Sequence, residues 1–163
     1  MIANDIVDLK VAERESNWKR KGYLHKIFTQ EEQMLILSGP DPQVMVWLLW
    51  SMKEAAYKIY SSKNGTRSFA PTKLCCEVSN LSLDHSTGLV RMEEAVFFTE
   101  SILNDHLIHT ICASGKDELR QIKVNISMPQ DPLNFNYSTL QPQCVSHHGA
   151  YLALVFLSRG SLQ

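Results

Sequence analysis

Residues 47–60, WLLWSMKEAAYKIY, form the clearest helical stretch of the chain and constrain the fold most. Side chains at helical spacing make a mostly apolar stripe, which is wide enough to pack on a sheet or on a second helix. A helix of this kind therefore predicts a partner layer elsewhere in the chain. The stripe consists of Val44, Trp47, Leu48, Ser51, Ala55, Lys58 and Ile59.

A second row of side chains, Trp50, Glu54, Tyr57 and Lys58, runs beside this stripe. Glu54 and Lys58 are four residues apart with the acid nearer the N-terminus, which is the favourable orientation for a helical ion pair. A surface ion pair explains that spacing on its own. One carboxylate among lysines and aromatic rings also offers what a phosphate or metal site needs, and the spacing leaves both interpretations open.

Residues 50–58, WSMKEAAYK, resemble the signature helix of the 4′-phosphopantetheinyl transferases, whose pattern is Trp/Phe-Ser/Ala-x-Lys-Glu-Ala/Ser-x-x-Lys. NDIVDL near the N-terminus resembles the opening motif of that family, with Ala3-Asn4 where a glycine usually precedes the aspartate. The resemblance implies that Asp5 is a Mg²⁺ ligand and that Asp8 is a weaker candidate. Without it, an acid such as Asp5 is typical of an N-cap or a turn.

Two further segments support the resemblance. Residues 28–32, FTQEE, predict a helix start with Thr29 as N-cap and Glu32 three residues later, and they are similar to the Phe-Thr-x-x-Glu segment of the family. Ser146-His147 resembles a Ser-His motif that leads into a terminal strand, although a histidine at such a position is more often structural. The resemblance implies that Ser146 and His147 contact coenzyme A, and it places the motifs in the order of single-module synthases.

Beyond the motifs, hydrophobic patterns predict an α+β fold, with antiparallel strands packed against the long signature helix. We expect strands near 1–10, 74–78, 89–98, 107–113, 122–126 and 144–157, and a turn at 86–88. We also expect an exposed helix over 11–23 closed by Gly22, a polar loop over 61–67, and a Pro/Asn-rich loop of unknown role over 129–142.

Composition sets the remaining limits. With 163 residues, 44% of them hydrophobic, the chain predicts a single domain over residues 1–163. A net charge of −1 gives no basic field for nucleic acid, and no apolar run is long enough for a membrane helix. The acidic N-terminus lacks the pattern of a signal peptide. The four cysteines favour free thiols, and hence a cytoplasmic protein.

The function implied by the resemblance is Mg²⁺-dependent transfer of 4′-phosphopantetheine from coenzyme A to a serine of an acyl or peptidyl carrier protein, with release of adenosine 3′,5′-bisphosphate. Asp5 and Glu54 would hold the metal, Lys58 and Lys53 would offset phosphate charge, and His147 would bind the nucleotide. Either Glu54 or a metal-bound water would take the serine proton. The carrier could belong to fatty acid, polyketide or peptide synthesis.

The charged segment 11–23 is either a solvated face or a docking surface for an acidic carrier protein, with Arg14 as the best candidate and Arg20 and Lys21 as weaker ones. Because the family builds its site between two modules, a one-module chain predicts a homo-oligomer, with a trimer favoured over a dimer. Two alternatives are a non-catalytic module of the same fold that binds coenzyme A or the carrier, and a chance signature on an unrelated α+β domain.

Overall fold

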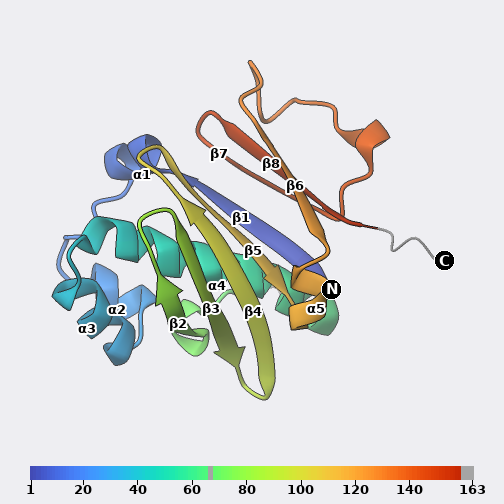
Figure 1. Cartoon of the computed structure of the whole chain (residues 1–163). Coiled ribbons are helices and arrows are strands. Elements are labelled where there is room, and N and C mark those ends of the chain that lie inside the picture. Colours follow the sequence, from blue (N-terminus) through green and yellow to red (C-terminus); the bar gives the residue numbers. More distant parts are fainter. Residues whose placement is uncertain (66–67, 159–163) are drawn as a thin grey trace.

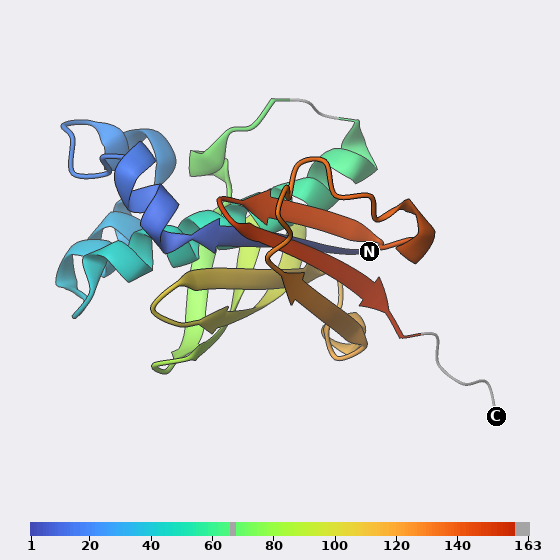
Figure 2. The same ribbon diagram turned by 90° about the horizontal axis from the view of Figure 1, so that it is seen from above.

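Strand β1 (Ile2–Asp8) is buried along its whole length, and its composition follows from that position. Alternate side chains of a strand point to opposite faces. Ala3 and Val7 join the main hydrophobic core beneath helix α4 (Pro42–Asn64), whereas Ile2 and Ile6 pack in two small clusters against a second sheet. The strand therefore lies between two layers, as Figures 1 and 2 show for the blue strand.

The computed structural model describes residues 1–65 and 68–158, and its strands form two antiparallel sheets. The larger sheet has the order β1-β5-β4-β3-β2, so β1 is an edge strand that pairs only with β5. The smaller sheet has the order β6-β8-β7 and lies beside β1 (Figure 1). The strands are β2 Cys75–Leu81, β3 His85–Met92, β4 Ala95–Leu103, β5 Leu107–Ala113, β6 Ile122–Ser127, β7 Cys144–His148 and β8 Tyr151–Leu157.

Helix α4 confirms the predicted helix and extends it at both ends. It begins after Asp41, whose side chain accepts a hydrogen bond from the backbone of Val44, and it ends at Gly65 in the left-handed conformation. The predicted capping box of Thr29 and Glu32 starts the preceding helix. The remaining helices are α1 Leu9–Glu15, α2 Tyr23–Ile27, α3 Gln30–Ser38 and α5 Lys116–Leu119, with short 3-10 turns at Pro71–Lys73 and Ser138–Leu140.

The predicted α+β fold is thus confirmed, and none of the described helices has the length and apolar character needed to cross a membrane. All four cysteines are free thiols, as predicted.

The predicted helix over 11–23 is wrong in its bounds. Helix α1 starts earlier, because the carboxylate of Asp8 caps the backbone N–H of Val11, and it stops at Ser16. Asn17 then accepts a hydrogen bond from the backbone of Lys19, a local contact that competes with helix formation. Gly22, with φ of 82°, begins helix α2 and does not end α1.

The predicted turn at 86–88 is also wrong, because these residues lie inside β3. A side chain at Gly88 would bring a Cβ within 2.3 Å of the carbonyl oxygen of Glu77 on β2, so the glycine permits close strand contact. The chain turns instead between β2 and β3, and again at Glu93, where φ is 54°. The predicted strand over 89–98 is therefore wrong as well, because it spans the end of β3, this second turn and the start of β4.

Two further bounds differ from the prediction. Residues 144–157 form a hairpin, with Gly149 at φ of 55° in the turn. The predicted loop over 61–67 is helical as far as Asn64, and Thr66 and Arg67 lie outside the described residues.

Lys53 and Glu32 form a buried ion pair between α3 and α4. The Lys53 Nζ lies 2.8 Å from Glu32 Oε2, and the two side chains are 0% and 2% exposed. Lys53 also donates to the carbonyl oxygens of Pro71 and Leu74, while Glu32 accepts from the backbone N–H groups of Thr29 and Cys76. Each charge is therefore surrounded by hydrogen-bond partners, which joins α3, α4 and the start of β2.

Replacing Lys53 by methionine should lower the free energy of unfolding by about 3–5 kcal/mol, because it leaves the Glu32 carboxylate buried without its cation. The double variant with Glu32→Gln should recover part of that loss. Urea unfolding of both variants checks this. A Lys53→Met protein of normal stability would contradict a structural role.

Candidate functional site

A pocket of about 310 Å³ lies beside β1, where its walls come from the start of the chain, helix α4 and the C-terminal hairpin. It contains two of the predicted metal-ligand residues, Asp5 and Glu54, together with His147. Aromatic side chains supply part of its wall. The lining residues are Asp5, Ile6, Val7, Ala12, Ser16, Tyr23, Trp47, Trp50, Glu54, His147 and His148.

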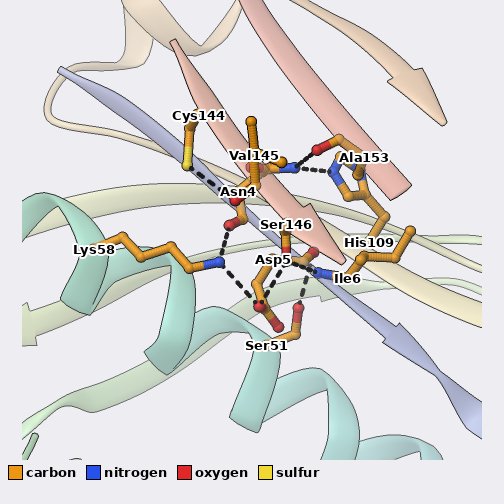
Figure 3. Close-up of polar contacts among 10 residues, drawn as sticks. All are labelled: Asn4, Asp5, Ile6, Ser51, Lys58, His109, Cys144, Val145, Ser146 and Ala153. Atoms are coloured by element: carbon orange, nitrogen blue, oxygen red, sulfur yellow. Dashed lines mark hydrogen bonds and ion pairs between the residues drawn. The ribbon is translucent and has the colours of Figure 1, made fainter. Parts of the chain in front are cut away.

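Asp5 lies near the middle of β1 and is 8% exposed. Its Oδ1 atom is 3.2 Å from Lys58 Nζ and accepts a hydrogen bond of 3.2 Å from the hydroxyl of Ser146 (Figure 3). Burial raises the pKa of this carboxyl, while Lys58 and the hydrogen bonds from Ser146 and Ser51 oppose the rise. Asp5 is therefore a buried acid inside a polar network, and neither an N-cap nor a turn residue.

Lys58 does not form the predicted helical ion pair with Glu54. Its Nζ donates to the backbone oxygen of Asn4 at 2.7 Å and contacts Asp5, because β1 brings these acceptors against α4. An ammonium group has three N–H donors, so one donor of Lys58 is left for a ligand. Its side chain is 31% exposed.

Glu54 is the most unusual group of the pocket. No hydrogen bond or ion pair holds its carboxylate within residues 1–65 and 68–158. Its pKa is raised to about 7, first by burial and then by the negative charge of Asp5, with Lys58 acting in the opposite direction. A carboxylate with these neighbours binds a cation or a proton readily.

Ser146 and His147 reach the same site from β7 of the same chain. The Ser146 hydroxyl accepts from the backbone N–H of Ile6 at 3.1 Å while donating to Asp5, so it is used within the protein and holds the strand edge (Figure 3). His147 is exposed at the pocket. The Ser-His motif of the same chain thus lies beside Asp5, and the predicted homo-oligomer stays a prediction.

A buried hydrogen bond from Asn4 links the small sheet to β1. Asn4 Nδ2 donates to the carbonyl oxygen of Ala153 on β8 and lies 3.1 Å from Nε2 of His109 (Figure 3). The pKa of His109 is lowered to about 4, chiefly by burial and also by Lys58, so this imidazole is neutral near pH 7.

Three predicted site residues have surroundings in the structure that do not suit their predicted roles. The ammonium of Lys53 is fully buried against Glu32, which does not fit a contact with coenzyme A. Asp8, the weaker metal candidate, caps helix α1 and accepts from the backbone of Ala150, so its carboxylate is occupied. Ser146 is occupied as described above.

The predicted carrier-binding residues are exposed. Arg14 lies on α1, and Arg20 and Lys21 lie in the turn before α2, where the Arg20 guanidinium is 5.4 Å from the ring centre of Tyr23. Since Tyr23 lines the pocket, Arg20 lies near its rim.

Sequence reasoning missed two features of the pocket. His148 lines it and accepts from the backbone of Asp8, and the indole N–H of Trp47 is buried without an acceptor among the described residues. The position of His148 next to the Ser-His motif was the one available signal. A larger cavity of about 850 Å³, lined by residues such as Lys10, Val44 and Leu103, contains none of the predicted site residues.

The donor set fits a hard cation with incomplete protein coordination. Within the described parts of the chain, no three histidine, cysteine, aspartate or glutamate side chains are grouped to hold a metal ion. Asp5 and Glu54 are two carboxylates at one pocket, and Mg²⁺ is typically bound by one or two carboxylates together with phosphate oxygens and water.

Comparison with known proteins agrees with this site. A family model described as the 4′-phosphopantetheinyl transferase superfamily matches residues 1–112. The matched part contains Asp5, Glu54 and Lys58 and ends within β5, so the small sheet with Ser146 and His147 lies outside it. No curated protein matches the chain.

Replacing Glu54 by glutamine should change how stability depends on pH in a metal-free buffer. Because the folded-state pKa of about 7 exceeds the ordinary value of 4.5, the native protein binds the extra proton, and its stability falls as pH rises between these values. The variant should lack this part of the fall and should be the more stable protein above pH 7. Urea unfolding with a chelator, from about pH 5 to 8, measures both curves.

When Mg²⁺ replaces the chelator, it should stabilise the unmodified protein at the upper end of this range and leave Glu54→Gln unchanged. Parallel pH curves for the two proteins would show that Glu54 is not the perturbed group.

Proposed function

The chain belongs to the 4′-phosphopantetheinyl transferase superfamily, and on this basis we propose that it transfers 4′-phosphopantetheine from coenzyme A to a serine of an acyl or peptidyl carrier protein. The observation that carries the proposal is the meeting of Asp5, Glu54 and His147 at one pocket, with Lys58 bound to Asp5. These groups are the acids, the cation and the imidazole that the reaction needs.

The reaction exchanges one phosphorus–oxygen bond for another. The serine oxygen of the carrier bonds to the phosphorus next to the pantetheine, and the bond from that phosphorus to the bridging oxygen of the pyrophosphate breaks. Adenosine 3′,5′-bisphosphate leaves with the bond electrons, and the serine proton goes to a base. Either Glu54, which has no protein partner among the described residues, or a water held by the metal would receive it.

Asp5 and Glu54 would hold Mg²⁺, which when bound neutralises and orients the phosphates. Lys58 would add the third donor of its ammonium group to a phosphate oxygen, since its other donors are used by Asn4 and Asp5. Ser146 keeps Asp5 in place and does not bind substrate itself. His147, exposed at the pocket, would bind the nucleotide end of coenzyme A.

The carrier would dock beside the pocket through Arg14, Arg20 and Lys21. Carrier proteins are acidic in this reaction class, and exposed cations near the rim favour their approach and orientation. Free cysteines agree with the reducing cytoplasm as the place of action, and residues 1–163 are proposed to work as one domain.

Incubation with coenzyme A, Mg²⁺ and a panel of apo carrier proteins should add a phosphopantetheine mass to at least one carrier, as read by intact-mass spectrometry. Glu54→Ala should lower the initial rate by about 100-fold or more, because it removes charge that acts on the reacting phosphates. Glu94→Ala, at an exposed glutamate in the turn after β3, is the matched control and should react normally. Coenzyme A binding without transfer to any carrier would favour the non-catalytic binding module.

We further propose that one chain forms a complete site, whatever its oligomeric state; the homo-oligomer itself stays a prediction. A mixture of Glu54→Ala and His147→Ala proteins should then be no more active than the sum of its parts. If the site were shared between subunits, mixed oligomers would contain sites with both residues intact, and activity would return. Light scattering on the same samples establishes whether the chains associate.

A further inference from the structure

We propose that His148 is a further substrate-binding residue, whose imidazole is fixed as a neutral donor and donates its Nε2–H to an oxygen atom of coenzyme A. The inference rests on the proposed function, because it assigns a contact within the same pocket. It is carried by the surroundings of His148, which lies outside the matched part of the chain.

The first argument is the hydrogen bond at the other ring nitrogen. The backbone N–H of Asp8 donates to Nδ1 of His148 at 2.8 Å. A nitrogen that accepts such a bond carries no proton, so a neutral ring must hold its proton on Nε2. The fold therefore selects one tautomer and leaves Nε2 as a donor.

The second argument is that the turn carrying His148 is held at both ends by Asp8. The Oδ2 atom of Asp8 accepts from the backbone N–H of Ala150 at 3.2 Å, while Oδ1 caps α1 at Val11. Between them, Gly149 has φ of 55°, and a Cβ there would lie 2.3 Å from Oδ2 of Asp8. This close contact of the turn with Asp8 orients the imidazole, which a binding residue requires.

The third argument is that the pocket contains donors without acceptors. His148 lines the pocket, and nothing in residues 1–65 or 68–158 accepts a hydrogen bond from its Nε2. Trp47 lines the same pocket, and its indole N–H is buried without a partner in the described structure. Buried donors are normally paired, so the unpaired indole N–H of Trp47 in the same pocket points to a ligand that supplies oxygen acceptors.

Both groups are neutral donors, so they suit a phosphate oxygen or an amide carbonyl. Coenzyme A carries both kinds of acceptor, the first in its phosphates and the second in its pantetheine arm. Calorimetric titration with adenosine 3′,5′-bisphosphate and with 4′-phosphopantetheine therefore separates the nucleotide end from the pantetheine end.

Two substitutions test the roles of the two ring nitrogens of His148 separately. In His148→Asn the amide oxygen can replace Nδ1 as acceptor for Asp8, but nothing reaches the position of Nε2. In His148→Gln the longer side chain can place an N–H near Nε2, but the acceptor for Asp8 is lost. His106→Asn, at an exposed histidine in the turn before β5, is the control for removing an imidazole.

We expect His148→Asn to unfold like the unmodified protein and to bind coenzyme A about tenfold more weakly, the size of effect typical of one lost hydrogen bond to a ligand. His148→Gln should unfold more easily yet bind more tightly than His148→Asn. The loss of affinity in His148→Asn should appear either with adenosine 3′,5′-bisphosphate or with 4′-phosphopantetheine, and not with both. The fragment that shows it contains the acceptor. Nitrogen-15 spectra of the free protein should assign the Nε2–H tautomer to His148.

Normal binding of coenzyme A by His148→Asn would overturn the proposal, as would an Nδ1–H tautomer or an imidazolium in the spectra. If the affinity for coenzyme A falls only in the variant whose free energy of unfolding also falls, His148 has a structural role and does not bind substrate. Because binding is measured without a carrier protein, these results are independent of transfer. Failure of transfer with intact binding rejects the proposed function alone, and no binding of coenzyme A to the unmodified protein rejects both.

Discussion

The free edge of β1 is the constraint on which both the fold and the site depend. An edge strand exposes unpaired N–H and C=O groups, which must find partners when the strand is buried. Here side chains supply them: Ser146 accepts from Ile6, His148 accepts from Asp8, and Lys58 donates to Asn4. The same side chains also contact Asp5 or line the pocket. The hydrogen bonds that close the edge therefore also assemble the candidate site.

The two lysines of the signature helix differ in burial, and this difference suits one to a structural role and the other to a role at the site. Lys53 lies in a closed arrangement in which Glu32 and two carbonyl groups use its whole ammonium, so no donor remains for a ligand. Lys58 is partly exposed, and within residues 1–65 and 68–158 it is the cation that acts on both carboxylates, Asp5 and Glu54. The site thus carries more negative charge than its nearby cation balances, at a cost in stability that a bound divalent cation would offset.

The sequence predicts those parts of the structure that local rules govern. Helical periodicity located α4, and the Thr29–Glu32 capping box located the start of α3, because both depend on residues within a few turns. The opening and signature motifs predict Asp5 and Glu54 as site residues. The partner of Lys53 lies on another helix, and the partner of Lys58 lies on β1, which local spacing does not reveal. A glycine such as Gly88 is typical both of a turn and of a close contact between two strands, so the sequence alone does not separate the two. The position of Glu77 on β2 shows that Gly88 permits a close strand contact.

The path of the chain after β5 explains how motifs that are far apart in sequence meet at one pocket. Because β1 pairs with β5 on one side only, its other edge is available to whichever strand reaches it. The small sheet reaches it from the same chain and is fixed by two apolar clusters, one around Ile2 and Val155 and one around Ile6 and Ala153. The hydrogen bond from Asn4 to the carbonyl oxygen of Ala153 adds a polar contact between the sheets, which limits how the smaller one can shift along β1. Burial of β1 on this face therefore places His147 and His148 of the same chain at the pocket that contains Asp5 and Glu54.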